Sequence, residues 1–139
     1  MAEYEHHEQP FAPVFDENSK VLILGTFPSV KSRANNFYYG HPQNRFWKVL
    51  AALCGELVPQ TVEEKKSLVL RHQIAIWDVI ESCDIIGSSD SSIKNVVPAD
   101  IAGLLCKTQI ERIYVNGTLA KTLYDRFALP ATGIDAVKL

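Results

Sequence analysis

The chain has 139 residues, of which 47% are apolar and 22% charged, and its formal net charge is −2. This composition excludes disorder, collagen-like repeats and a coiled coil, and the length suits one domain, expected over residues 1–139. A net charge near zero argues against coating nucleic acid by bulk electrostatics, although it leaves room for a local basic rim.

We expect neither a membrane span nor a secretory signal. The longest apolar run, residues 21–24, is far shorter than the roughly 20 residues that a membrane span needs. The N-terminus has neither a basic start nor an apolar stretch, unlike a secretory signal. We therefore expect a cytoplasmic protein without membrane contact, in which His6 and His7 lie solvated in a polar N-terminal arm.

The cysteines do not form a recognisable ligand motif. They are odd in number, widely spaced and set among apolar residues (Cys54, Cys83 and Cys106). Neither a disulfide framework nor a CxxC zinc or redox motif can be built from that spacing. The pattern predicts buried thiols and no metal site.

The first half of the chain alternates predicted strands and helices. A continuous apolar run predicts a buried strand over 20–26, and the turn Gly25–Ser29 and a polar loop follow it. A helix is expected from Asn44, a candidate N-cap, to a stop at Gly55. A second helix is expected over 61–72, where Thr61 to Glu64 has the form of a capping box.

The second half continues the alternation. Apolar residues predict a second buried strand over 74–80, and the polar stretch 81–95 is expected to be a loop. The remaining expected elements are a short helix opened by Pro98 and running to Cys106, a strand over 112–115, an amphipathic helix after Gly117, and the start of a strand over 134–139. Strands that alternate with helices predict an α/β sandwich with a mainly parallel sheet.

Ligands of such sheets bind in the crevice beyond the carboxyl ends of the strands. The stretches to inspect are therefore 26–29, 78–82 and 116–117. Asn44 and Asn116 both fall at ends of elements that face this crevice, and an amide can bond the edge of a base or position an attacking water. Simple N-capping by Asn44 and a turn role for Asn116 are the competing interpretations.

The segment FYYGHPQNRFW, residues 37–47, is the most informative stretch. Consecutive aromatic residues in a loop cost solubility unless they stack on something, and stacking on a base contributes about 1–3 kcal/mol. The alternative is that Phe37, Phe46 and Trp47 fill the core while Tyr38 and Tyr39 cap it.

Together with KVLILGTFPS at residues 20–29, this segment resembles the N-terminal half of the uracil-DNA glycosylase superfamily, and its hypoxanthine (deoxyinosine) DNA glycosylase branch most closely. Mismatch-specific uracil glycosylases are relatives of that branch. The resemblance implies a three-layer α/β/α sandwich around a four-stranded, mainly parallel sheet. It also implies a monomeric, monofunctional enzyme without a cofactor, which flips a deaminated base out of DNA and hydrolyses its N-glycosidic bond.

The resemblance also implies residue roles. The first loop, which binds water and substrate, corresponds to Gly25, Thr26, Phe27, Pro28 and Ser29. In the mismatch-specific relatives an Asn stands where this sequence has Phe27, and a phenyl ring cannot orient water. The resemblance to the hypoxanthine branch implies that the catalytic role passes to another Asn, which corresponds to Asn44, with Asn116 as its polar partner. Tyr39 corresponds to the aromatic residue that stacks on the flipped base. Candidates for phosphate or base contacts are Ser29, Lys31, Ser32, Arg33 and His41.

Family members continue past the last strand into a Pro-Ser-rich loop that inserts into the minor groove. The sequence ends at Leu139, where that loop should begin, so we expect the loop to be lacking and DNA binding to be weak.

The leading hypothesis is a repair enzyme that excises hypoxanthine, and also uracil, from DNA. A mismatch-specific uracil glycosylase and a non-catalytic α/β module that binds a nucleotide or a protein are the alternatives. A phosphate-cradling nucleotidase is disfavoured because the first strand is not followed by a Gly-rich phosphate loop.

Overall fold

The computed structural model describes residues 3–27, 37–39, 45–87 and 89–139. Within these residues the strands form two sheets. The parallel sheet has the order β3 (Ile74–Asp78), β2 (Val21–Gly25), β6 (Arg112–Val115) and β7 (Ala136–Lys138), and the small antiparallel sheet has the order β1 (Glu5–Glu8), β4 (Ile80–Ile85) and β5 (Lys94–Pro98).

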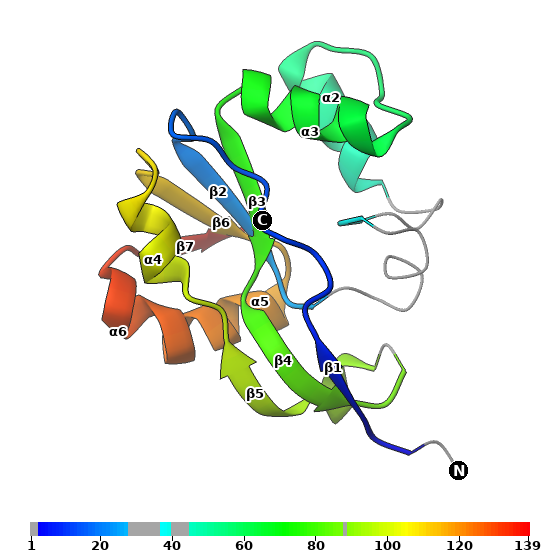
Figure 1. Ribbon diagram of the computed structural model, residues 1–139, viewed down its shortest axis with the longest axis vertical. Coiled ribbons are helices and arrows are strands. Elements are labelled where there is room, and N and C mark those ends of the chain that lie inside the picture. The colour runs from blue at the N-terminus through cyan, green and yellow to red at the C-terminus, as the bar shows by residue number, and fades with distance from the viewer. Residues whose placement is uncertain (1–2, 28–36, 40–44, 88) are drawn as a thin grey trace.

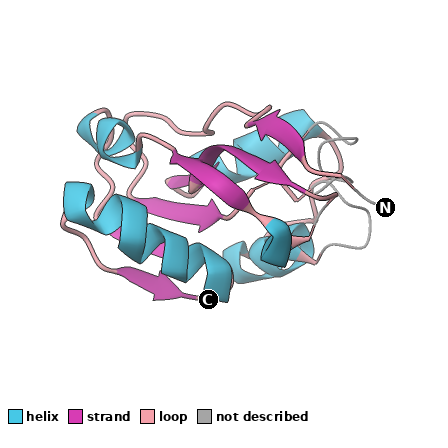
Figure 2. Ribbon diagram, turned by 90° about the horizontal axis from the view of Figure 1, so that it is seen from below, coloured by secondary structure: helices cyan, strands magenta, loops and turns pink. Residues whose placement is uncertain are grey.

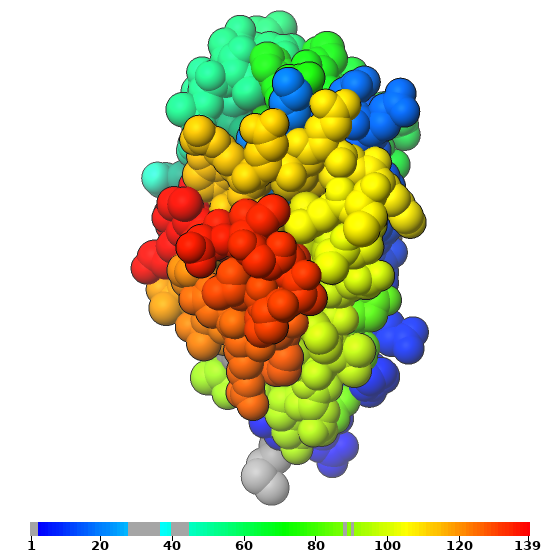
Figure 3. Space-filling view, turned by 90° about the vertical axis from the view of Figure 1, so that its left-hand side faces the viewer, coloured from blue at the N-terminus to red at the C-terminus, as the bar shows by residue number. Residues whose placement is uncertain are grey.

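Helices cover both faces of the parallel sheet. On one side lie α2 (Phe46–Cys54) and α3 (Val62–Arg71), and on the other lie α4 (Ile101–Cys106), α5 (Thr118–Leu123) and α6 (Leu129–Thr132) (Figure 1). Figure 3 looks onto the outer surface of the second layer, where α4 and the α5–α6 region lie side by side. The expected α/β/α sandwich with a four-stranded parallel sheet is confirmed for the described part of the chain.

The core follows the apolar runs of the central strands. Leu22 and Leu24 of β2 and Val115 of β6 have no exposed surface, and neither does Ile76 of β3. Strands covered on both faces lack the alternation of apolar and polar residues that half-buried strands have, so the continuous runs identified them correctly.

The ends of α2 and α3 follow their capping residues. Gly55 ends α2 in the left-handed conformation, at φ 68°, as expected. The cap position at the start of α2 is Arg45, whereas Asn44 lies outside the described residues. The Thr61 hydroxyl accepts from the Glu64 N–H at 3.1 Å, and the Glu64 carboxylate accepts from the Gln60 N–H at 2.8 Å. The capping box is thus confirmed at Thr61, with its return bond displaced by one residue.

The prediction of a loop over 81–95 is wrong at both ends of this stretch, where β4 and β5 form instead. β4 continues almost directly from β3 beyond the edge of the parallel sheet, and it pairs with β1 on one side and with β5 on the other. The small sheet lies at the lower end of the molecule in Figure 1 and comes forward in Figure 2. The Ser-rich middle of this stretch does lie between β4 and β5, whereas its two ends belong to a partly exposed sheet with an irregular register, which has no apolar run to reveal it.

The start of one expected helix is wrong. Pro98 ends β5, and α4 begins three residues later, because Asp100 caps it by accepting from the Gly103 N–H at 3.0 Å. His6 is exposed, as expected, and His7 is half-buried, but both belong to the strand β1, where His6 Nδ1 lies 2.9 Å from the Asp84 carboxylate.

The helix expected after Gly117 is present, with a π-helical turn, Tyr124–Ala128, between α5 and α6. The cysteine prediction is confirmed for Cys83, which is buried. It is wrong for Cys106, which is exposed at the end of α4, and Cys54 is half-buried.

The aromatic segment packs largely into the core. Phe37, Tyr38 and Trp47 are at most 4% exposed, and the Phe37 and Trp47 rings stack with centroids 5.9 Å apart. The Trp47 indole N–H donates to the Tyr38 carbonyl at 3.0 Å. Core packing, the alternative to an exposed stacking surface, is therefore confirmed for these residues.

Candidate functional site

The carboxyl ends of three parallel strands meet at one edge of the sheet, and hydrogen bonds tie them together. The Asn116 N–H, just after β6, donates to the Leu24 carbonyl at 2.8 Å. The Val79 N–H, just after β3, donates to the Gly25 carbonyl at 2.9 Å. Side chains at the ends of β2, β3 and β6 are therefore held in fixed relation to one another, as a site at this edge requires.

Gly25 lies at the centre of this edge and has no room for a side chain. A Cβ atom at this position would lie 2.5 Å from Asp78 Oδ1 and 3.0 Å from the Tyr39 hydroxyl. Real Cβ atoms do not approach oxygen this closely, so the glycine allows the carboxylate and the phenol to reach the β2 backbone.

Tyr39 is held in an unusual conformation over the end of β2. Its φ is 53°, in the left-handed region that bulky residues avoid, and its ring stacks on Phe46 with centroids 3.9 Å apart. The Tyr39 hydroxyl is buried and makes no hydrogen bond of good geometry within the described part of the chain. Local strain and an unsatisfied buried polar atom are both features that concentrate at functional sites.

The electrostatic surroundings of Tyr39 favour its neutral form. Burial raises the pKa of its hydroxyl, and the Asp78 carboxylate raises it further, while the neighbouring Asn116 side chain lowers it in part. Tyr39 therefore offers a protonated hydroxyl, a hydrogen-bond donor, next to the Asn116 amide.

Asp78, the last residue of β3, is a site residue to which the sequence alone assigned no role. It is 3% exposed, and burial raises its pKa to about 6, while hydrogen bonds from Gln9 and from the Gly25 backbone lower it. A carboxylate whose pKa lies close to neutrality, inside a crevice, is a functional-site candidate. The signal in the sequence was a lone acid ending an apolar strand, within the 78–82 stretch selected for inspection.

An open groove of about 510 Å³ adjoins this edge, between the sheet and α2. Ile23 and Tyr114 contribute to its sheet side and Phe46 and Leu50 to its helix side, and Asn116 lies on its border. Its volume is within the range of small-molecule sites. Phe46 belongs both to this groove and to the Tyr39 stack.

The structure brings together some of the predicted site residues. Gly25, Tyr39 and Asn116 converge, as described above. The Thr26 carbonyl accepts from the Ile80 N–H at 3.2 Å, and Phe27 is half-buried against the core. The other predicted site residues lie outside the described ranges: Pro28, Ser29, Lys31, Ser32, Arg33, His41 and Asn44.

Among the described residues, no group of three or more His, Cys, Asp or Glu side chains is arranged to hold a metal ion. In the same part of the chain, every helix is too short or too polar to cross a membrane.

Comparison with known proteins assigns the family. The model of the Uracil DNA glycosylase superfamily matches residues 12–132. The chain belongs to this superfamily. Its β2, β3 and β6, with the site at their carboxyl ends, all lie within the matched range.

Relatives from two archaea are similar over much of the chain. A protein of Methanosarcina acetivorans named Hypoxanthine DNA glycosylase is 40% identical over 95 residues, which are 68% of this chain and 60% of that protein. One of the same name from Methanosarcina barkeri is 38% identical over 89 residues, 63% of this chain and 56% of the relative. The matched segments thus span less than two thirds of either relative.

A solved structure shares the fold. It is the solution NMR structure of a "putative Uracil DNA glycosylase" from Methanosarcina acetivorans, with a TM-score of 0.81 and 33% identity. The similarity covers 95% of this chain and 82% of that one.

Proposed function

We propose that this protein is a DNA glycosylase that hydrolyses the N-glycosidic bond of deaminated bases, with hypoxanthine as its main target. The observation that carries the proposal is the 40% identity to a protein named Hypoxanthine DNA glycosylase. The convergence of Gly25, Tyr39 and Asn116 at the carboxyl edge of the sheet supports it, because ligands of open α/β sheets bind there.

In the proposed reaction a flipped nucleotide enters the crevice and water replaces the base. The bond between sugar C1′ and the base nitrogen breaks, its electron pair leaves with the base, and the water oxygen bonds to C1′. One proton of the water ends on the base, so the products are the free base and an abasic sugar. The protein has to hold the base, stabilise its developing negative charge and present the water.

The proposed roles follow from the family resemblance together with the chemistry of each residue. Asn44 holds the water through its amide oxygen, and Asn116 and backbone N–H groups of the first loop bond the base. The base stacks on Tyr39, whose ring Phe46 fixes from one face at 3.9 Å between centroids. Further contacts to base or phosphate are assigned to Ser29, Lys31, Ser32, Arg33 and His41. The hydrolysis needs no cofactor, and we propose that the protein acts as a cytoplasmic monomer.

The test is single-turnover excision from DNA that contains deoxyinosine, measured for the wild type and for Asn44→Ala. We expect a loss of about 100-fold or more, because removing a positioned catalytic group costs on this order. Asn18→Ala is the matched control. Asn18 lies in an exposed turn, and it is its backbone N–H, which alanine keeps, that donates to the Asp16 carboxylate. Excision by Asn44→Ala at the wild-type rate would contradict the assignment.

Uracil is the second candidate substrate, favoured by the similarity to the solution structure named above. Excision rates of hypoxanthine and uracil from duplexes of the same sequence show which base is the better substrate. DNA binding without any abasic product would instead support the non-catalytic alternative.

A further inference from the structure

The N-terminal segment contacts the Asp78 carboxylate from outside the range that the family model matches, which begins at residue 12. The Gln9 Nε2 amide donates to Asp78 Oδ2 at 2.8 Å. The Gly25 N–H also hydrogen-bonds to this carboxylate. Asp78 is thus a buried acid between a side-chain donor from the N-terminus and a backbone donor from β2.

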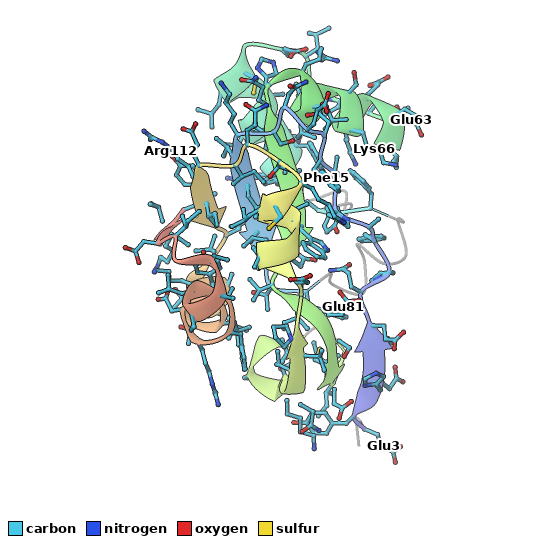
Figure 4. All side chains as sticks on the ribbon, turned by 60° about the vertical axis from the view of Figure 1, so that its left-hand side comes forward. Glu3, Phe15, Glu63, Lys66, Glu81 and Arg112 are labelled. Carbon is cyan, nitrogen blue, oxygen red and sulfur yellow. The ribbon has the colours of Figure 1, made fainter. Side chains whose placement is uncertain are left out.

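Gln9 is itself fixed in place by two further bonds. Its own N–H donates to the Glu81 carbonyl at 2.7 Å, and its side-chain Oε1 accepts from the Phe11 N–H at 3.2 Å. Figure 4 shows Glu81 on β4 beside this N-terminal segment. Because Phe11 holds the amide oxygen, the amide nitrogen is the atom left to face Asp78.

The same segment also contacts Tyr38, the chain neighbour of Tyr39. The Tyr38 hydroxyl donates to the Phe11 and Ala12 carbonyls, each at 3.1 Å, and the Phe11 and Tyr38 rings pack edge to face. Residues 9–12 therefore contact Asp78 of the polar cluster that Gly25, Asp78 and the Tyr39 hydroxyl form, and also Tyr38, the chain neighbour of Tyr39.

We propose that Gln9 is a positioning residue of the excision site, which acts through the Asp78 carboxylate to hold Gly25 and the end of β2 in place beside the Tyr39 hydroxyl. This inference rests on the proposed glycosylase function. It makes the N-terminal segment part of the site, although residues before 12 fall outside the family match.

The arrangement requires the ionised form of Asp78. A carboxylate accepts both the Gln9 and the Gly25 bonds, whereas a protonated acid turns one oxygen into a donor. The groups that face Asp78 are the Gln9 amide, the Gly25 N–H and the hydroxyls of Tyr38 and Tyr39, with Glu81 close to Tyr38. In the described part of the chain no cationic side chain contributes to the pKa of Asp78: burial raises it, and the donors of Gln9 and Gly25 lower it in part.

The experiment is a pH profile of single-turnover excision from inosine-containing DNA, with the wild type, Gln9→Met and Gln9→Glu. Methionine keeps the length of the side chain without a donor, and glutamate adds a second negative charge. We expect the acid limb to move up by roughly one pH unit in Gln9→Met and further in Gln9→Glu, because a lost hydrogen bond raises the pKa of Asp78. At pH 6.5 excision by Gln9→Met should fall about threefold and recover by pH 8.5.

The exposed neighbour Glu8 provides the matched control, since Glu8→Gln should keep the wild-type profile. Carbon-13 NMR titration of Asp78 in the same proteins gives its pKa directly and shows that each variant is folded. An unmoved acid limb in both Gln9 variants, or equal loss at every pH without a change in the Asp78 pKa, overturns the inference alone. A wild type that excises no base overturns the proposed function, and the positioning role with it.

Discussion

Two carboxylates, one near each end of β3, have opposite surroundings. Glu56, which follows α2, accepts from the Arg71 guanidinium and the His72 ring just before β3, and its bond to Arg71 is the main cause that lowers its pKa. Asp78, at the carboxyl end, is buried with the neutral donors Gln9 and Gly25, and its pKa is raised to about 6. The first pattern is that of a surface ion pair, whereas the second is typical of a group adjusted for function near neutral pH.

The strongest test of this difference uses one glycine beside each carboxylate. In Gly25→Ala the new Cβ would lie 2.5 Å from Asp78 Oδ1, so the carboxylate or the β2 end must move. We expect a destabilisation of about 1–3 kcal/mol and, since small displacements of a site are costly, excision lower by about 100-fold. Single-turnover kinetics and urea unfolding measure the two effects.

Gly55→Ala, next to Glu56, is the matched control. Gly55 has open space around it but a φ of 68°, so alanine there costs about 1–2 kcal/mol of stability through backbone strain alone. Its excision rate per folded molecule should equal that of the wild type. The comparison fails if the two alanine variants lose excision to the same extent.

The pH dependence of stability should differ in sign between the two carboxylates. Because the folded pKa of Asp78, about 6, lies above the ordinary value of 3.8, its contribution is greatest at low pH and is lost as the pH rises through about 6. The loss is on the order of 3 kcal/mol. Glu56, with a lowered pKa, stabilises the fold above its ordinary value of 4.5 and loses this contribution as the pH falls.

Urea unfolding between pH 3.5 and 8 measures both contributions. Asp78→Asn should remove the decline between pH 4 and 6, and Glu56→Gln should remove part of the rise from acid pH. If Asp78→Asn kept the wild-type slope, the raised pKa of this carboxyl would be wrong.

The sequence predicted the site best where it depends on strand ends. Gly25 and Asn116 each follow a continuous apolar run, and parallel strands bring such positions to one edge, so their meeting was foreseeable. The placement of Tyr39 beside them came from the motif, because its left-handed backbone and its stack on Phe46 leave no periodic signal.

What the sequence did not predict depends on contacts between distant segments. Gln9 and Asp78 lie 69 residues apart, and a polar N-terminal arm has no pattern that predicts its pairing with β4. The β4–β5 pair was missed because its strands carry polar residues on exposed faces and its register is irregular. Their pairing is fixed by tertiary contacts rather than by local propensity.

The smallest expected effects come from removing the hydroxyl of Tyr38 or of Tyr39, two neighbouring tyrosines beside Asp78. The Tyr38 hydroxyl donates to two carbonyls, whereas the Tyr39 hydroxyl has no hydrogen bond of good geometry with the described residues. Tyr38→Phe should therefore cost about 1 kcal/mol of unfolding free energy and leave excision unchanged.

Tyr39→Phe should leave stability unchanged and lower excision. The native fold gains little from a hydroxyl that makes no hydrogen bond of good geometry with the described residues. We expect its stability to stay at the wild-type level and single-turnover excision to fall about 3- to 10-fold, the value of one hydrogen bond made only with bound substrate. Stacking on the base would survive this change, since the ring remains. Excision at the wild-type rate would mean that Tyr39 contributes only its ring, through stacking on the base.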